Sequence, residues 1–187
     1  MDNSELKAEL ERHHSASFGW ALSCCGRDCS EAEEVLQTVY LKILEGKARF
    51  RGESSFKTWL FAVIRKTAIS EHRRTLLRRL RLLAIPAPAP ESETACEQPA
   101  VAMERSEAQI RFQKALSQLP ARQREALHLV FYQDMSLSEA AEVMGISLGS
   151  ARQHYDRGKK RLRETLVETD LDYGIGWRRK ETPGAVS

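Results

Sequence analysis

The stretch from residue 136 to residue 166, SLSEAAEVMGISLGSARQHYDRGKKRLRETL, constrains the fold of this chain more than any other part. Ser136 and Glu139 have the spacing of a capping box, which predicts that a helix begins at Ser136. Gly145 can adopt the left-handed backbone conformation that ends such a helix. Ser147 is suited to cap a second helix that runs to the end of the stretch. The sequence therefore predicts two helices joined by a tight turn, which is the geometry of a helix-turn-helix.

The second of these helices is expected to carry short, polar and basic side chains on its outer side. In a helix-turn-helix the N-terminal part of the second helix enters the major groove, where arginine and glutamine bond to base edges. Basic residues farther along contact phosphates. The alternative is a helical hairpin with a solvated charged face, but the caps and the one-sided basic run together favour DNA binding. The candidate DNA-contacting residues are Ser150, Arg152, Gln153, Asp156, Arg157 and Lys160.

The charge distribution extends this prediction to a second part of the chain. The net charge of +3 says little by itself about nucleic-acid binding. Arginine and lysine gather in residues 65–81 and 157–163, however, and glutamates gather between these blocks. The hydrophobic fraction of 42% and the charged fraction of 29% are typical of a globular protein. Two basic blocks separated by an acidic stretch indicate two DNA-facing modules and a connector.

Apolar residues recur with helical spacing on both sides of a proline-rich segment, so the predicted fold is all-α with two small helical domains. Prolines at positions 86, 88, 90 and 99 forbid a regular helix and favour an extended, flexible linker. The last part of the chain has no clear periodicity and is expected to be disordered. The predicted division is 1–83 for the first domain, 84–107 for the linker, 108–168 for the second domain and 169–187 for the tail.

A polar stripe lies beside the buried face of the helix predicted over residues 31–44. Glu34, Gln37 and Leu41 share this stripe at helical spacing. An exposed leucine between an acid and an amide is a candidate docking surface for another protein. Single exposed leucines are also common on ordinary surfaces, so an incidental leucine is an equal alternative.

A basic stripe lies on the outer side of the helix predicted over residues 56–83. For an isolated helix, a merely solvated face would be the favoured interpretation of such a stripe. Its members and their neighbours are Lys57, Arg65, Lys66, Ser70, Arg73 and Arg74.

Three of the four cysteines, Cys24, Cys25 and Cys29, lie close together near His13 and His14. Three thiols and a histidine could bind zinc, but adjacent cysteines suit one tetrahedral site poorly and no CxxC spacing exists. We therefore predict no metal site and no cofactor, with a redox-sensing role as the alternative.

Neither a membrane span nor a secretion signal is predicted. No apolar run approaches the roughly 18 residues that a span needs, and the N-terminus lacks the apolar core of a signal peptide. This predicts a cytoplasmic location, where the cysteines are expected to be thiols rather than disulfides.

Taken in order, the motifs resemble those of the sigma factors of bacterial RNA polymerase, specifically the extracytoplasmic-function (ECF) group. The sequence AEEVLQTVYLKIL at 32–44 is similar to region 2.2 of that family, with its acids, apolar pair and glutamine. The sequence FRGESSFKTWLFAVIRKTAISEHRR at 50–74 is similar to regions 2.3 and 2.4, with their tryptophan-leucine pair and closing double arginine. Region 4 is matched from residue 115 to residue 166, and the resemblance as a whole covers about residues 14–82 and 108–167.

The resemblance implies a function without catalysis and without a small-molecule substrate. Such a protein binds core RNA polymerase through the β′ clamp helices and the β flap, directs it to promoters and helps to open the DNA. The resemblance also implies control by an anti-sigma factor. By position it assigns Glu34, Gln37, Thr38 and Leu41 to the polymerase, the basic stripe from Lys57 to Arg74 to the minus-10 element, and Ser150 to Lys160 to the minus-35 element.

Four positions depart from the family pattern. Lys66 stands where an asparagine is usual and Ser70 where an aspartate is usual, so the minus-10 preference cannot be copied from relatives. Thr38 replaces the usual acid, which weakens one expected polymerase contact. Gly158 lies inside the second helix of the helix-turn-helix, where glycine costs about 1 kcal/mol and would permit a bend over the DNA backbone.

Two other classes of function fit the sequence less well. A stand-alone helix-turn-helix regulator would bind a palindrome as a dimer, but the sequence offers no coiled coil for dimerisation. Such a regulator also has no need of the basic helix in the first domain. An enzyme is the other class, and the sequence contains no phosphate loop, nucleophile motif or carboxylate pair in a plausible site.

Overall fold

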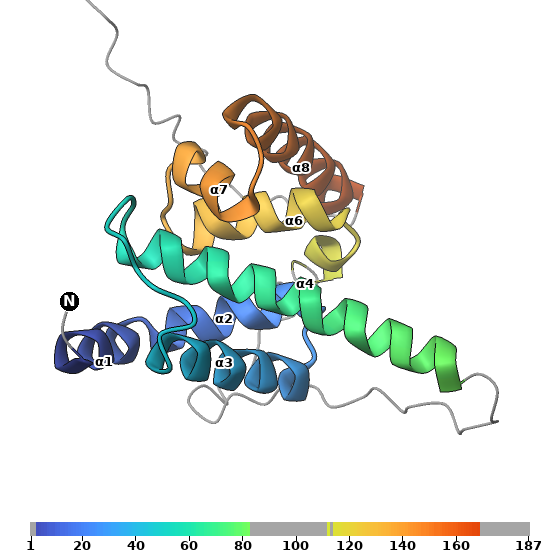
Figure 1. The fold of residues 1–187 in the computed structure, drawn as a ribbon. Helices are drawn as coiled ribbons and strands as arrows, with labels where there is room; N and C mark the ends of the chain where they lie inside the picture. The colour runs from blue at the N-terminus through green and yellow to red at the C-terminus, as the bar shows by residue number, and fades with distance from the viewer. Residues whose placement is uncertain (1–2, 83–111, 113, 169–187) are drawn as a thin grey trace, which may run out of the picture.

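The computed structural model describes residues 3–82, residue 112 and residues 114–168. These residues form helices, turns and loops, with no strand in the described ranges. The linker predicted at 84–107 and the tail predicted at 169–187 therefore lie outside the described residues. Figure 1 shows the arrangement of the helices. Their bounds are α1 Asn3–Arg12, α2 His14–Cys24, α3 Cys29–Leu44, α4 Phe56–Leu82, α6 Ala121–Leu127, the π-helical turn η1 His128–Tyr132, α7 Leu137–Met144 and α8 Leu148–Glu168.

The first domain consists of α1 to α4. A turn at His13, whose φ is −96° and ψ is 3°, separates α1 from α2. Asp28 caps α3, because its side chain accepts a hydrogen bond of 2.9 Å from the main-chain N–H of Glu31. The buried side of α3 is as the spacing predicts, except that Leu44, the last residue of the helix, is 46% exposed.

Trp20 and Phe61 form the centre of the first domain. Both are fully buried, their rings stack with centroids 6.0 Å apart, and the indole N–H of Trp20 donates a hydrogen bond of 3.0 Å to the main-chain carbonyl of Phe61. This bond satisfies the one polar group of the indole, as burial requires. It also ties α2 to α4.

The second domain contains the predicted helix-turn-helix, which the structure confirms. Ser136 and Glu139 form a complete capping box at the start of α7. Gly145 ends that helix with a φ of 64°, in the left-handed region where glycine carries no steric cost. Ser147 then caps α8, because its hydroxyl accepts a hydrogen bond of 3.2 Å from the main-chain N–H of Ser150.

The two domains pack directly against each other, which the sequence did not predict. In Figure 1, α6 and α7 lie over α4, and α4 contacts α7. One cluster of buried side chains includes the centre of the first domain and continues into the second. The second domain contributes Ala126, Leu129, Met135, Ala140, Val143 and Met144.

A smaller apolar cluster holds α6 and α8 together, and it explains Gly158. This glycine is buried, and a Cβ atom at its position would lie 3.2 Å from the side chain of Leu127 and 3.3 Å from Cβ of Gln123. The absence of a side chain therefore allows α8 to approach α6 closely. Close packing of α8 on α6 gives this glycine a structural role that the sequence did not predict.

Candidate nucleic-acid interface

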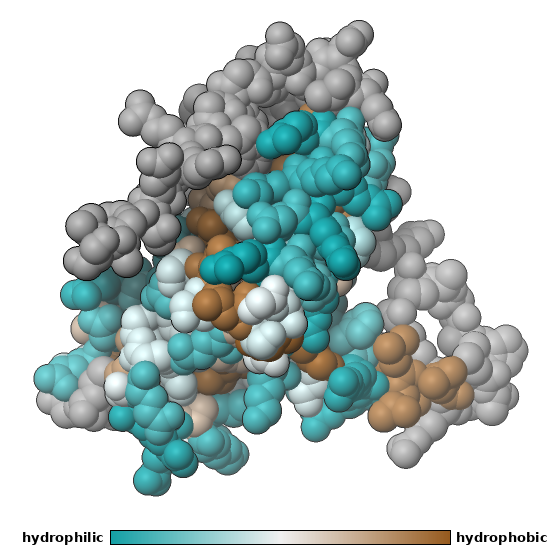
Figure 2. Space-filling view, turned by 90° about the horizontal axis from the view of Figure 1, so that it is seen from above, coloured by the Kyte–Doolittle hydropathy of each residue, from teal (hydrophilic) through white to brown (hydrophobic). Residues whose placement is uncertain are grey.

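The outer side of α8 carries the residues predicted to contact DNA. Ser150 is half-buried beside its cap, and Arg152, Gln153, Asp156, Arg157 and Lys160 are exposed. Figure 2 views the molecule from the side of α7 and α8 and shows hydrophilic side chains over much of this face. The opposite side of the helix is apolar and packs on the domain. Its fully or nearly fully buried residues are Ala151, Leu162 and Leu166.

Tyr155 lies on the flank of the same helix and contacts side chains before and after it in the chain. Its ring stacks on Phe131 with centroids 5.5 Å apart, and Nζ of Lys159 lies 4.3 Å from the centre of the Tyr155 ring. Lys159 also pairs with Asp156 at 3.3 Å. These contacts restrict the side chains on this flank of α8 by joining Tyr155 to Phe131 of η1 and to Lys159 one turn along the helix.

From Lys66 onward, α4 presents a second polar and basic surface. Lys66, Ser70, Arg73 and Arg74 are exposed there, as the helical spacing predicts. An open hollow runs along this surface and is lined by Ser70, Arg73, Arg74, Leu77 and Arg78. The sequence analysis did not single out the leucines beside it, although Leu76, Leu77 and Leu80 are 46%, 58% and 64% exposed.

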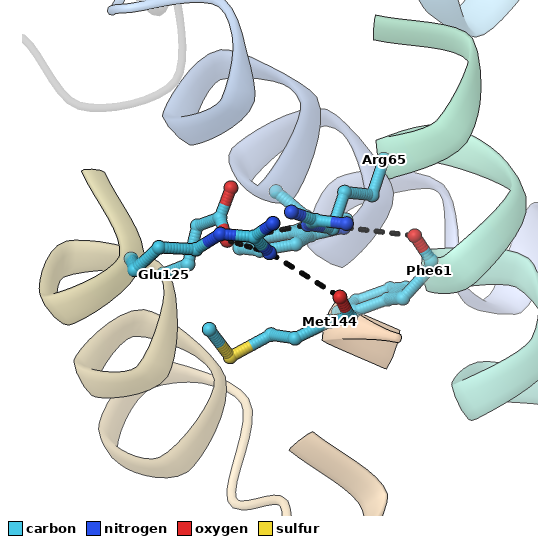
Figure 3. Close-up of polar contacts among 6 residues, drawn as sticks. Phe61, Arg65, Glu125 and Met144 are labelled. Carbon is cyan, nitrogen blue, oxygen red and sulfur yellow. Dashed lines mark hydrogen bonds and ion pairs between the residues drawn. The ribbon is translucent and has the colours of Figure 1, made fainter. Parts of the chain in front are cut away.

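Two candidate cations nearer the start of α4, Lys57 and Arg65, are different, because they are in contact with the second domain. Nζ of Lys57 donates a hydrogen bond of 2.6 Å to the main-chain carbonyl of Gln133. Nε of Arg65 donates one of 3.2 Å to Oε2 of Glu125, and Arg65 is only 9% exposed (Figure 3). Arg65 is therefore enclosed in this structure, whereas Lys57 is half-buried and its ammonium group is bonded to the second domain.

Aromatic side chains gather where the loop before α4 meets that helix. The ring centroids of Phe50, Phe56 and Trp59 lie 5.3–5.5 Å from one another, and His13 stacks on Phe56 at 6.0 Å. All four side chains are half-buried rather than fully buried. Aromatic faces beside basic residues are the common way to hold unpaired bases. The signal was present in the sequence as Phe50, Phe56 and Trp59, close to Arg49 and Lys57.

The polar stripe on α3 lies on the surface. Glu34 and Gln37 are exposed, Thr38 is half-buried and Leu41 is 58% exposed. Leu44 continues the apolar part of this face. An exposed apolar strip flanked by polar groups is typical of a site for another protein.

The cysteines of the described residues differ in their chemical state. Cys24 and Cys25 are free, and burial raises the pKa of Cys24 well above its ordinary value and that of Cys25 to about 12, so both stay protonated. Cys29 is disulfide-bonded, which corrects the expectation that all four are thiols. That expectation came from the compartment alone, which does not fix the state of a single cysteine. Within the described residues, no group of three or more histidine, cysteine or acidic side chains could hold a metal ion.

None of the helices in the described part of the chain combines the length and the apolar character that a membrane span requires.

Comparison with known families places both domains. Residues 10–78 match the family model of Sigma-70 region 2, and residues 115–164 match that of Sigma-70, region 4. The chain is 32% identical over 166 residues to the RNA polymerase sigma factor CarQ of Myxococcus xanthus, covering 88% of this chain and 91% of CarQ. It is 29% identical to the ECF RNA polymerase sigma factor SigX of Bacillus subtilis, covering 86% of this chain and 84% of that one.

Solved structures agree with this assignment. The sigma factor RpoE of Bartonella quintana, solved in complex with the anti-sigma factor NepR, superposes with a TM-score of 0.66 at 25% identity. The superposition covers 87% of this chain and 97% of that one. CnrH, solved with the cytosolic domain of CnrY, shares the fold with a TM-score of 0.59 at 19% identity, over 91% of this chain and 92% of CnrH. With both domains in the family order and with such relatives, the chain belongs to the extracytoplasmic-function sigma factors of bacterial RNA polymerase.

Proposed function

We propose that this sigma factor reads the minus-35 element of its promoters with the outer side of α8. The observation that carries the proposal is the capped helix-turn-helix, whose second helix leaves Arg152, Gln153 and Arg157 exposed near its N-terminal end. Arginine pairs with guanine and glutamine with adenine in the major groove. Lys160 lies farther along the helix, where phosphates would be reached.

We assign recognition of the minus-10 element to α4 and to the loop before it. Lys66, Ser70, Arg73 and Arg74 supply an exposed polar and basic face for the DNA strand. The aromatic cluster around Phe56 and the neighbouring loop supply the stacking surface for a base extruded during opening. Lys57 and Arg65 join this surface only after they leave the second domain.

We assign the binding of core RNA polymerase to the polar stripe on α3. Glu34, Gln37, Thr38 and Leu41 would contact the β′ clamp helices, and the second domain would contact the β flap. The apolar area at Leu41 and Leu44 gives this docking surface its affinity, since burial of apolar surface drives most protein association. The predicted domain boundaries, 1–83 and 108–168 with a linker at 84–107, complete the proposal.

Regulation and location follow from the family and its partners. Because the related RpoE forms a complex with an anti-sigma factor, we assign an anti-sigma partner to this chain as well. The protein would act in the cytoplasm, where promoter DNA and RNA polymerase meet, and as an initiation factor without catalytic activity of its own.

Transcription in vitro with purified core polymerase tests the proposal. Genomic fragments are transcribed with core enzyme alone, with the chain alone and with both, and the RNA starts are sequenced. The expected result is a set of starts that needs both components and shares two upstream boxes. Exchange of Leu41 for glutamate should reduce transcription from every start, because a charge replaces the apolar docking contact.

A stand-alone regulator would give a different result. Such a protein binds its operator without polymerase and does not create start sites with bare core enzyme. Starts that do not depend on this chain would overturn the assignment, and sequence-specific DNA binding as a dimer would favour the rival.

A further inference from the structure

The C-terminal end of α4 exposes apolar side chains that the proposed function does not use. Leu76, Leu77 and Leu80 are 46%, 58% and 64% exposed. Figure 1 shows that this end of the helix extends past α2 and α3. Single exposed leucines are common on protein surfaces, but three within five positions of one helix form a patch. A patch of this kind is typical of a surface that binds a partner or a membrane.

The three leucines share one side of the helix, and arginines surround them. At about 3.6 residues per turn, the leucines fall within an arc of about 100°. Arg73 lies within the same arc, and Arg74 and Arg78 lie along one edge of it; all three arginines are exposed. A long arginine side chain lays its methylene groups along an apolar surface while its guanidinium reaches outward. This face of α4 therefore offers apolar area and positive charge together.

The charge at this end of the helix has one sign. The sequence from residue 73 to residue 82, RRTLLRRLRL, contains five arginines and no acidic residue. Glu71 precedes this sequence and pairs with Arg74 at 3.3 Å, and the next acidic residue along the chain is Glu91. A helix that combines leucines with a block of arginines is typical of a segment that lies in the interface of a membrane. The surface that complements its charge is an anionic lipid leaflet.

From the exposed leucines and the arginine block we propose that the end of α4 binds the surface of a bilayer that contains anionic phospholipid. The leucines enter the boundary between the headgroups and the acyl chains, and the arginines bond to lipid phosphates. This segment is already helical in the free chain, so binding carries no cost of folding it. Three leucines are a small anchor, so the attachment is reversible and the helix lies on the membrane rather than across it.

Promoter DNA is the nearest alternative partner, because the basic stripe assigned to the minus-10 element reaches this part of α4. Duplex DNA would engage the arginines through its phosphates. It would leave the leucines in water, apart from a contact with a thymine methyl group. An anionic lipid surface accounts for both kinds of side chain, so it fits this face better than DNA does.

Lipid and promoter would compete for two of these side chains. Arg73 and Arg74 are assigned to the minus-10 element and also belong to the lipid-binding face. A chain bound to the membrane therefore cannot place these arginines on DNA. This consequence rests on the proposed function, whereas lipid binding itself does not.

Sedimentation of the full chain with vesicles tests the proposal. Vesicles of phosphatidylglycerol and phosphatidylcholine are compared with vesicles of phosphatidylcholine alone, in the absence of DNA and polymerase. The test variant combines Leu77→Gln with Leu80→Gln, which changes no residue assigned to DNA or polymerase. Leu148→Gln is the matched control, because Leu148 is also an exposed leucine, at 44%, but lies at the start of α8.

The wild-type chain should sediment with the anionic vesicles and remain in solution with the neutral ones. The double exchange should weaken binding to the anionic vesicles by about tenfold, because less apolar surface is buried. Arg78→Gln should weaken binding by about fivefold and reduce its dependence on salt. Leu148→Gln should bind like the wild-type chain, and circular dichroism checks that every variant keeps its helices.

Three outcomes would overturn the proposal. They are no sedimentation with anionic vesicles, equal binding to both kinds of vesicle, and an equal loss of binding in Leu148→Gln. If the double exchange leaves vesicle binding unchanged but lowers transcription without lipid, the face belongs to DNA or to another protein. A wild-type chain that binds anionic vesicles but supports no transcription with core polymerase would contradict the proposed function and leave lipid binding in place.

Discussion

The two long helices assigned to DNA, α4 and α8, differ in what covers them. They have 27 and 21 residues, and both combine an apolar side with a run of basic side chains. The recognition side of α8 is exposed, and its inner side packs within its own domain. By contrast, α4 is buried against its own domain on one side and against the second domain on another, so that Arg65 is enclosed. Under the proposed assignments, the comparison teaches that the minus-35 face on α8 is exposed, whereas part of the minus-10 face on α4 is covered by the second domain.

The exchange Trp20→Ala tests the α4 side of the comparison and carries the largest expected effect. Removal of this fully buried indole leaves a cavity beside Phe61 and His128, so the free energy of unfolding should fall by about 3–5 kcal/mol. Urea unfolding followed by circular dichroism measures the change. Because the two domains share this core, both should unfold in one transition.

Trp59→Ala is the control for that measurement. Trp59 is only half-buried in the aromatic cluster, so its loss should cost less than that of Trp20. Two separate transitions in the wild-type chain would show that the domains fold independently. In that case the contrast between a covered α4 and an open α8 would not hold in solution.

The contrast also explains what the sequence could predict. The helix-turn-helix was predictable because its signals are local: Ser136 and Glu139 are three positions apart, and Gly145 needs only its own backbone. The burial of Trp20 and Phe61 was not singled out, since the pattern of one helix does not show which other helix lies against it. The hydrogen bonds of Arg65 to Glu125 and of Lys57 to Gln133 join residues 60 and 76 positions apart, and such pairings depend on how domains dock rather than on local spacing. The exposed stripes on α3, α4 and α8 were found, but the enclosure of Arg65 was not.

The exchange Gln153→Ala tests the exposed recognition side of α8. If Gln153 bonds to a base in the major groove, its loss should weaken promoter binding by holoenzyme by about 2 kcal/mol, or roughly thirtyfold, at the preferred sequence. The preference of the holoenzyme for one base at one position of the minus-35 element should also become weaker. Binding to promoters with each base substituted at that element measures both effects.

Lys160→Ala separates base reading from phosphate contact. A phosphate contact should weaken binding to all promoter variants alike and reduce its dependence on salt. Relaxed discrimination in Lys160→Ala, or none in Gln153→Ala, would mean that the recognition face is placed differently on α8.

Protonation of His128 at acid pH should lower the free energy of unfolding of the chain. Burial between Trp20 and Tyr132, together with nearby Arg27, lowers the pKa of this imidazole from 6.5 to about 4. The unfolded chain therefore binds more protons than the folded one between pH 4 and 6.5, and stability must fall as the pH falls through that window. From pH 7 to pH 5 the loss at this site should be about 1–2 kcal/mol.

Unfolding in urea at both pH values, for the wild-type chain and for His128→Gln, measures this contribution. Glutamine keeps a polar group but cannot take up a proton, so the variant should lose less stability between the two pH values. An identical loss in both proteins would assign the acid sensitivity to other groups and would place the imidazole in water.

Two glycines on opposite sides of α8 give the smallest and most closely matched test. A side chain at Gly158 would meet Leu127 and Gln123 at 3.2–3.3 Å, whereas the Cβ at Gly149 would find only the hydroxyl of Ser147, at 4.0 Å. Alanine favours a helix over glycine by about 1 kcal/mol at either position. Gly149→Ala should therefore raise the free energy of unfolding by about that amount, while overpacking should outweigh the same gain in Gly158→Ala and leave a net loss of about 1 kcal/mol. Equal stabilisation by both exchanges, measured by thermal unfolding, would show that α8 is no closer to α6 than an ordinary helix pair.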